Sequence, residues 1–176
     1  MKKLLVSIIA TLSMLTCSFY YANAIEKNDS EIKNLYKEES QVVTVFNAKG
    51  KDIYITNDDI HLMAQIVYAE SCAEPYEGKV AVASVILNRV KDKGFPDNVE
   101  DVIKQRAAFS CVKNGEIDVK PDEYSFRAVM DALRGKDPTG NAVFFYNPKI
   151  ATCSWMKNIA KKNNKRIGNH VFFVVN

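Results

Sequence analysis

The chain has 176 residues, of which 47% are hydrophobic and 26% are charged. This composition excludes an intrinsically disordered protein and is sufficient for one globular domain with a buried core. The formal net charge of +3 gives no indication of a nucleic-acid partner, and we expect a monomer that binds no nucleic acid.

The first 24 residues have the layout of a secretory signal peptide. Lys2 and Lys3 precede an apolar run from Leu4 to Leu15, and a small-x-small sequence ends at Ala24. This run is shorter than the roughly 20 apolar residues that span a bilayer. We therefore predict export, cleavage after Ala24 and no stable membrane span in the mature chain. A retained anchor and a lipoprotein site at Cys17 are the alternatives.

Residues 25–56 are predicted to be a leader in front of the main domain. EIKNLYKEES (31–40) favours a short polar helix, and QVVTVFNAKGKDIYI (41–55) favours two short strands around a turn at 47–50. The alternative for this segment is a partly ordered tether.

The main domain is predicted to begin at Asn57 with two long helices. In the first, Ile60, Met63, Ala64 and Val67 recur at helical spacing. The second begins near Pro75, a residue favoured in the first turn, and runs to Lys93. Its centre, VAVASVILNRV (80–90), is apolar nearly all round, which predicts a buried helix at the axis of the core.

Shorter elements follow in the second half of the chain. DNVEDVIKQ (97–105) and PDEYSFRAVMDALRG (121–135) favour helices, the latter with four side chains facing inward: Phe126, Val129, Met130 and Leu133. NAVFFYNP (141–148) and HVFFVV (170–175) favour strands that pair antiparallel, with a short helix between them at 152–161. The predicted class is a mostly helical α+β fold.

One acidic residue, Glu70, ends the first long helix on the flank of its apolar stripe, within a turn of Ile66 and Val67. Partial burial and the negative end of the helix dipole both favour the protonated acid. General-acid cleavage of a glycosidic bond requires such a group. The alternative is that the last helical turn frays and Glu70 points into water.

Cysteines and histidines give no metal-site spacing. After signal cleavage Cys72, Cys111 and Cys153 remain, which allows one disulfide and a free thiol or three free thiols. The sequence has only two histidines and lacks CxxC and HExxH patterns. We therefore predict no metal and no cofactor.

The block IVYAESCAEPYEGKVAVASVILNRV (66–90) resembles the signature of the SleB/CwlJ-type cell-wall hydrolases, the spore-cortex-lytic enzyme family. The resemblance continues in three later blocks: DVIKQRAAFSCV (101–112), DPTGNAVFFYNP (137–148) and RIGNHVFF (166–173).

The resemblance implies a lysozyme-like catalytic domain over residues 57–176 that acts on peptidoglycan. It implies cleavage between N-acetylmuramic acid and N-acetylglucosamine by a lytic transglycosylase that leaves 1,6-anhydro ends, with Glu70 as the catalytic acid. Lysis of the spore cortex during germination and action on the vegetative wall both stay open. The implied location is the cell wall, the spore cortex or coat, or the extracellular space.

Other residues are candidates for the substrate site: Phe109, Ser110, Tyr146, Asn147 and His170. Aromatic faces suit sugar rings, but an ordinary core role is the alternative for Phe109 and Tyr146, and a structural role is the alternative for His170.

A two-carboxylate muramidase would use Glu74 or Glu77 as the partner of Glu70. The alternative for both glutamates is stabilisation of the dipole of the second helix from its first turn.

Two further functions are possible. A thiol hydrolase would pair Cys111 or Cys72 with His170. A non-catalytic cell-wall-binding module would use the basic stretch KKNNKR (161–166) to contact anionic wall polymers.

Overall fold

The computed structural model describes residues 42–48 and 51–175. The predicted signal peptide and the predicted polar helix at 31–40 lie outside this range. In the described part of the chain, no helix combines the length and the apolar content that a bilayer crossing requires.

A β-hairpin leads into the helices, as predicted. Strands β1 (Val42–Ala48) and β2 (Lys51–Thr56) pair antiparallel, with Val45 opposite Tyr54. Alternate side chains of β2 point into the protein, and Ile53 and Ile55 are buried in the hydrophobic core.

Helix α2 (Asn57–Ser71) follows β2 without a loop because Thr56 caps it. The Thr56 hydroxyl accepts a hydrogen bond from the Asp59 N–H at 3.1 Å, and the Asp59 carboxylate accepts one from the Thr56 N–H at 2.9 Å. This reciprocal capping box satisfies donors that the helix itself leaves free. The predicted inward stripe is confirmed, since all four of its residues are buried: Ile60, Met63, Ala64 and Val67.

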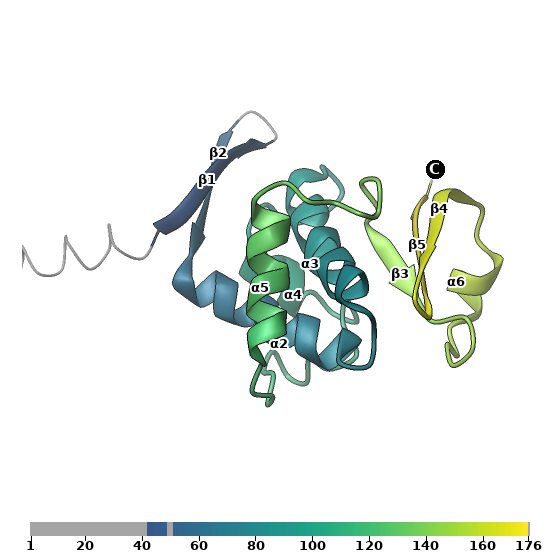
Figure 1. The fold of residues 1–176 in the computed structure, drawn as a ribbon. Helices are drawn as coiled ribbons and strands as arrows, with labels where there is room; N and C mark the ends of the chain where they lie inside the picture. The colour runs from purple at the N-terminus through teal and green to yellow at the C-terminus, as the bar shows by residue number, and fades with distance from the viewer. Residues whose placement is uncertain (1–41, 49–50, 176) are drawn as a thin grey trace, which may run out of the picture. The chain divides into compact units, whose positions relative to one another are not determined.

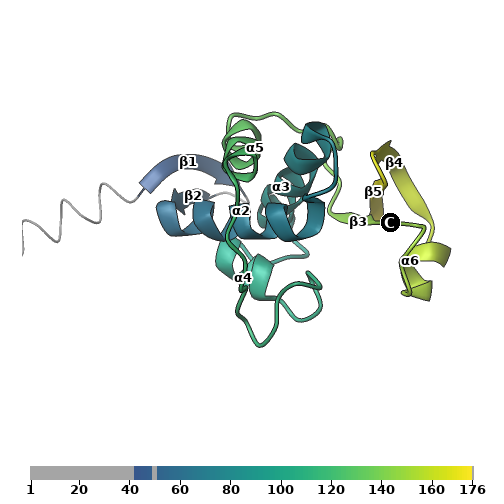
Figure 2. The same cartoon turned by 60° about the horizontal axis from the view of Figure 1, so that its bottom comes forward.

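Helix α3 (Tyr76–Lys91) is the axis of the core, as predicted. Every residue from Gly78 to Val90 is buried. The helix packs against α2, against α4 (Val99–Lys104) and against α5 (Glu123–Leu133), and these surround it in Figures 1 and 2. A helix that is apolar on all sides needs such cover.

The inward face of α5 differs from the prediction. Val129 is buried, but the larger Phe126, Met130 and Leu133 are only partly covered. The other fully buried positions carry small side chains: Ser125, Ala128 and Ala132. Small residues let two helices approach closely, so the larger side chains lie at the margins of the contact.

A three-stranded antiparallel sheet completes the fold, in the order β3-β5-β4. Strand β3 (Phe144–Tyr146) pairs with β5 (His170–Val175), which confirms the predicted antiparallel pair. The short helix α6 (Ser154–Asn158) leads to β4 (Lys161–Ile167), a strand that the sequence analysis did not predict. Figure 1 shows this sheet beside the helices.

Candidate active site

Glu70 is the next-to-last residue of α2 and is partly buried. The Ser110 hydroxyl, from the loop after α4, donates a hydrogen bond to Glu70 Oε1 at 3.3 Å. Two residues that the sequence separates by 40 positions therefore meet, and Ser110 helps to fix the orientation of the carboxylate.

The end of α2 is held in place by Lys79. This side chain is buried, and its Nζ donates to the carbonyl oxygens of Ser71 at 2.7 Å and Cys72 at 3.2 Å. Helix α2 has no basic residue in its own last turn, so the cation that satisfies its terminal carbonyls comes from α3. The alternative of a frayed last turn is therefore wrong. Sequence reasoning missed Lys79, although a lysine inside a buried helix was a usable signal.

A second buried cation, Arg89, lies within electrostatic reach of Glu70. Arg89 is 4% exposed, and its Nε donates to the carbonyl of Val143 at 2.8 Å. Burial lowers the pKa of Arg89 to about 10, an effect that the negative charge of Glu70 opposes. Arg89 therefore remains cationic at neutral pH. Its Nη1 has no hydrogen-bond partner among the described residues.

The thiol of Cys111 is also close to Glu70. Burial raises the pKa of Cys111 to about 12, and the charge of Glu70 and a hydrogen bond to its side chain add to this effect. The thiol stays protonated at neutral pH, whereas a nucleophilic cysteine must be a thiolate. This argues against a thiol hydrolase that uses Cys111. In the described part of the chain Cys72, Cys111 and Cys153 are all free.

Glu74 is fully engaged in structural hydrogen bonds. Its Oε2 accepts from the backbone N–H of Asn169 at 2.9 Å, and its Oε1 accepts from Asn169 Nδ2 at 3.0 Å. Burial alone would raise the pKa of Glu74, but the hydrogen bonds from Asn169, with smaller contributions from His170 and Lys79, hold it below its ordinary value. A carboxylate whose side chain is 7% exposed and whose pKa is lowered is a poor base for activating water.

Glu74, in the α2–α3 loop, and Glu77, in α3, thus have different roles. Glu77 lies exposed in the first turn of α3, where a negative charge stabilises the helix dipole as predicted. Glu74 precedes Pro75, the N-cap residue, so the dipole interpretation is wrong for Glu74.

The side chain of His170 is influenced by the charges of both Glu70 and Glu74. Burial lowers the pKa of His170, and the charges of Glu74 and Glu70 oppose this effect. Its Nδ1 is 3.9 Å from Glu74 Oε1, too far for a hydrogen bond, and is buried without a hydrogen-bond partner among the described residues. The ring packs edge-on against Phe145, with centroids 5.3 Å apart. The structure therefore presents a neutral imidazole to the site.

The two aromatic candidates, Phe109 and Tyr146, lie in different surroundings. Phe109 is 4% exposed and lies under the Arg89 guanidinium, 4.9 Å from its ring centroid. Phe145, which sequence reasoning missed, lies between Phe109 and His170: its ring is tilted against that of Phe109, with centroids 6.4 Å apart, and meets His170 edge-on. Tyr146 points to the opposite face of the sheet and meets Phe173 edge-on.

Asn147 directly follows the last residue of β3, and its side chain stabilises the next turn rather than contacting Glu70. Its Oδ1 accepts from the N–H of Lys149 at 3.0 Å and so stabilises the turn that follows. The structure therefore brings Ser110 and His170 near Glu70. Phe109 is linked to this group indirectly, because its ring lies under Arg89, which is itself within electrostatic reach of Glu70. Within residues 52–175, no described contact brings Tyr146 or Asn147 to Glu70.

No group of three or more His, Cys, Asp or Glu side chains in the described part of the chain could hold a metal ion. The predicted independence from metals stays a prediction.

Comparison with known proteins identifies the family. The model of the cell wall hydrolase family matches residues 73–173. The chain belongs to this family. The match begins three residues after Glu70, so the proposed acid itself lies just outside it.

The chain is similar to a spore cortex-lytic enzyme of Halalkalibacterium halodurans, with 50% identity over 117 residues. This alignment covers 66% of the chain but only 35% of that relative, so the chain spans about a third of the relative's length.

Two solved structures match over 68% of the chain. The first is the catalytic domain of the Bacillus cereus SleB protein, with 47% identity, a TM-score of 0.61 and 91% of that structure covered. The second is the catalytic domain of the germination-specific lytic transglycosylase SleB from Bacillus anthracis, with 46% identity, a TM-score of 0.62 and 96% covered. These matches confirm the predicted mostly helical, lysozyme-like α+β domain.

Proposed function

We propose that the chain is a peptidoglycan-cleaving enzyme that uses Glu70 as its single catalytic acid and base. The observation that carries this proposal is the contrast between two carboxylates. Glu70 is partly exposed at a fixed helix end, where it accepts a long hydrogen bond from Ser110 and a weak one from the thiol of Cys111, whereas both oxygens of Glu74 are occupied by Asn169. Glu70 is thus free to exchange a proton with a substrate, and Glu74 is not.

The reaction that suits one carboxyl group is a lytic transglycosylation. Protonated Glu70 donates its proton to the oxygen between N-acetylmuramic acid and N-acetylglucosamine, and that C–O bond breaks as positive charge develops on the sugar. Glu70, now a carboxylate, accepts the proton of the C6 hydroxyl as its oxygen bonds to C1. The product is a 1,6-anhydro end, and no water enters. Simple hydrolysis would need a second carboxylate to activate water.

The neighbouring residues support these proton transfers. Arg89 supplies a buried positive charge that stabilises the carboxylate formed when Glu70 gives up its proton. Ser110 orients Glu70, and neutral His170 can hydrogen-bond a sugar hydroxyl. We assign Phe109 a supporting position beneath Arg89, because its ring is buried. Tyr146 and Asn147 are proposed as more distant substrate contacts on the sheet.

The biological setting is proposed from the relatives and the N-terminus. A spore cortex-lytic enzyme and a germination-specific lytic transglycosylase are among the similar proteins, so we propose cortex peptidoglycan as the substrate. The signal-like residues 1–24 support export to that location. We propose residues 25–56 as a leader and residues 57–176 as the catalytic domain.

Product analysis tests the function. Purified protein is incubated with cortex and with vegetative peptidoglycan, and the released fragments are weighed by mass spectrometry. We expect anhydro ends, which lack the mass of one water, and a loss of about 10²–10⁴-fold in rate for Glu70→Gln. The matched variant Glu77→Gln should retain most activity. Reducing ends as the main product, together with an inactive Glu77→Gln, would establish a two-carboxylate hydrolase instead.

A further inference from the structure

Charge is distributed very unevenly along the chain. Residues 57–137 contain 11 basic and 15 acidic residues, a net charge of −4. Residues 138–176 contain no acidic residue and six basic ones: Lys149, Lys157, Lys161, Lys162, Lys165 and Arg166. We call residues 138–175, which form β3, α6, β4 and β5, the basic lobe. The small overall charge of the protein conceals this separation.

The cations of the basic lobe are not neutralised within the described structure. Lys161 Nζ donates to the backbone carbonyls of Lys157 and Ile159, both at 3.2 Å. Arg166 Nε donates to the carbonyl of Gly168 at 3.4 Å. No lysine or arginine of this lobe is within 4.0 Å of a described carboxylate, unlike the Lys136–Asp131 pair at 2.8 Å in the helical part. The lobe therefore presents net positive charge to solvent.

Protection of a sheet edge explains only part of this pattern. Strand β4 is an edge strand, and lysines on such strands hinder pairing with other chains. Lys162 and Lys165 alone would serve that purpose. Lys149 and Lys157 lie outside β4, and a lobe that needs only edge protection has no reason to exclude every acidic residue.

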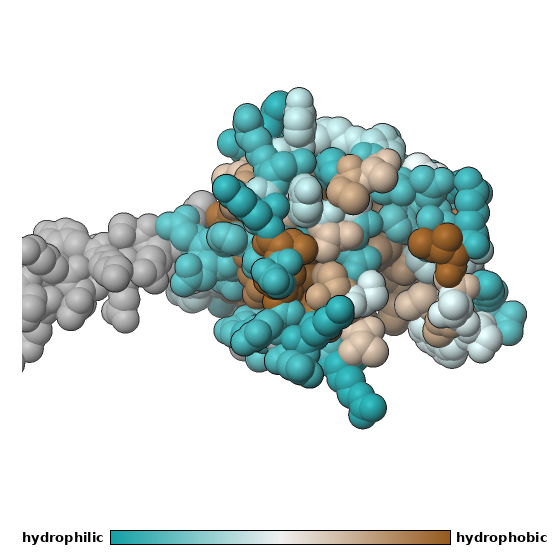
Figure 3. Space-filling model, turned by 90° about the horizontal axis from the view of Figure 1, so that it is seen from below, coloured by the Kyte–Doolittle hydropathy of each residue, from teal (hydrophilic) through white to brown (hydrophobic). Residues whose placement is uncertain are grey.

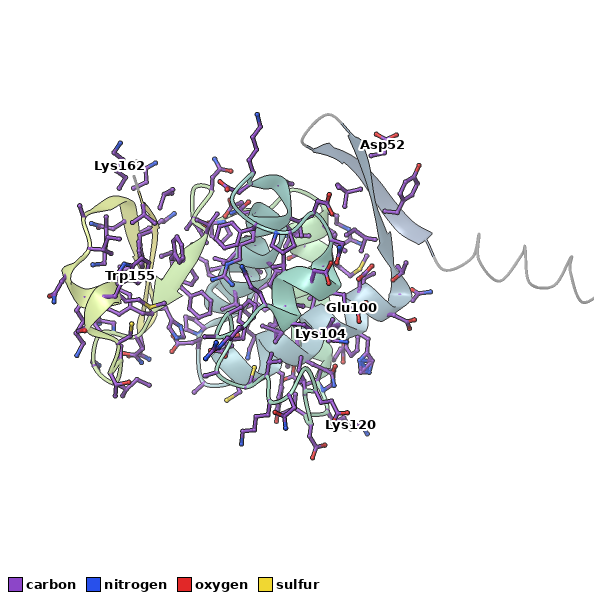
Figure 4. All side chains as sticks on the ribbon, turned by 180° about the vertical axis from the view of Figure 1, so that it is seen from behind. Asp52, Glu100, Lys104, Lys120, Trp155 and Lys162 are labelled. Atoms are coloured by element: carbon purple, nitrogen blue, oxygen red, sulfur yellow. The ribbon has the colours of Figure 1, made fainter. Side chains whose placement is uncertain are left out.

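Exposed apolar groups lie among these cations. The side chain of Trp155 is 46% exposed, and that of Ile150 is 76% exposed. Trp155 and Lys162 both belong to the basic lobe, which lies on the other side of the helices from Asp52 (Figure 4). Hydrophilic side chains form the outer edge of this lobe on the face in Figure 3. A lobe that carries both cations and an exposed indole suits a ligand that combines sugar rings with carboxylates.

The basic lobe also adjoins the proposed active site. Strand β5 carries His170, and the β4–β5 turn is fastened to Glu74 through Asn169. Lys149 Nζ donates to Oδ1 of the same Asn169 at 3.4 Å. A polymer in contact with Glu70 can therefore extend over the lobe.

We propose that the basic lobe binds the stem-peptide carboxylates of the peptidoglycan strand that Glu70 cleaves. This inference rests on the proposed function. Stem peptides recur along the glycan and carry free carboxylates, so successive peptides can meet successive cations. The contact retains the enzyme on its insoluble substrate between cleavages, and it weakens as salt screens the charges.

Binding is measured by co-sedimentation with insoluble peptidoglycan sacculi from which teichoic acids have been removed. All proteins carry Glu70→Gln, so that the sacculi stay intact. We expect Lys162→Glu/Lys165→Glu to weaken binding about tenfold and to reduce its salt dependence. The neutral pair Lys162→Gln/Lys165→Gln should show a smaller loss. The control Lys93→Glu/Lys120→Glu makes the same charge change on exposed sites of the helical part and should stay within about twofold of its parent.

Sacculi whose carboxylates have been amidated provide the second arm. We expect the parent protein to bind amidated sacculi as weakly as Lys162→Glu/Lys165→Glu binds native sacculi. Undiminished binding to amidated sacculi, binding only to sacculi that retain teichoic phosphate, or an equal loss in the control pair would each overturn the inference. These results are independent of the reaction product, so reducing ends from the active enzyme would refute the proposed transglycosylase while leaving the docking result intact.

Discussion

The carboxylate of Glu74 receives two hydrogen bonds from Asn169, a residue 95 positions further along the chain. The contact joins the α2–α3 loop, which follows Glu70, to the β4–β5 turn, which precedes His170. Glu74 therefore positions the sheet against the helices at the place where the proposed site forms. Its effect on activity should act through this geometry rather than through proton transfer.

A double-mutant cycle tests this coupling. Glu74→Ala and Asn169→Ala should each lower the free energy of unfolding by about 1–3 kcal/mol, because a buried hydrogen-bonding partner is lost. The double variant should lose clearly less free energy of unfolding than the sum of the two single losses, since the two residues are each other's hydrogen-bond partners. Urea unfolding measures all three, with the exposed Glu77→Ala as a control that should lose at most about 1 kcal/mol. Additive losses would mean that the two residues act independently.

Gly168 is the residue that allows this contact. Its φ is +57°, and a Cβ at this position would lie 2.0 Å from Glu74 Oε2 and 2.9 Å from Pro75 Cδ. Gly168→Ala should therefore lower the free energy of unfolding by more than backbone strain alone would, which is about 1–3 kcal/mol. Gly140→Ala is the matched control, since Gly140 has a φ of +69° and open space around it. Thermal unfolding of both variants measures the difference, and equal losses would contradict a steric role for the Glu74 contact.

Local patterns predicted most of the helical part correctly. Apolar spacing in α2 and the continuous apolar run in α3 were reliable because both helices bury the faces that those patterns mark. Strand β4 was missed because KKNNKR has no apolar alternation. An edge strand in solvent takes its stability from backbone pairing with β5 on one side, and no periodic side-chain signal is required.

Long-range partners of charged residues were not predictable. The side chains of Glu74, Lys79 and Arg89 are buried in the structure, and nothing in the sequence indicated what each one contacts. Their hydrogen-bond partners are backbone carbonyls of other elements or a side chain far along the chain. Such partners depend on tertiary packing, which spacing along one helix does not reveal.

The charge of Arg89 should set part of the pH dependence of activity. Arg89 stabilises the Glu70 carboxylate to the same extent that Glu70 stabilises the cation. In Arg89→Gln the buried positive charge beside Glu70 is gone, so the alkaline limb of the activity profile should move upward by roughly 0.5–1 pH unit. The other groups near Glu70, namely Ser110, Cys111 and His170, are unchanged in this variant.

Two comparisons separate this charge effect from a loss of structure. Arg89→Lys keeps the positive charge and should restore most of the original profile. Arg106→Gln removes an exposed charge and should leave the profile in place. A loss of activity that is equal at every pH in Arg89→Gln would indicate that Arg89 contributes only through packing.

Acid sensitivity of the fold should begin with His170. Because burial lowers the pKa of His170 in the folded state, the unfolded chain takes up this proton first as the pH falls below about 6.5, the ordinary value for histidine. The free energy of unfolding should therefore decrease from that pH downward, by at most about 1.4 kcal/mol per pH unit for this one proton.

Glu74 adds a second decrease in the free energy of unfolding at lower pH. The pKa of Glu74 is lowered in the folded state. Its stabilisation of the fold is therefore complete above the ordinary glutamate range and is lost as the pH falls through the folded value.

Unfolding by urea at intervals between pH 8 and pH 4 separates the two groups. In His170→Gln the decrease between about pH 6.5 and 5 should largely disappear, because the protonating imidazole is gone while Glu74 is still ionised. His61→Gln is the matched control: His61 is exposed on α2, and its replacement should keep the wild-type slope. In Asn169→Ala, which removes the side-chain hydrogen bond that favours the charged Glu74 but keeps the one from the backbone N–H, the decrease below pH 5 should become shallower. An unchanged slope between pH 6.5 and 5 in His170→Gln would show that the buried imidazole is not the group that titrates.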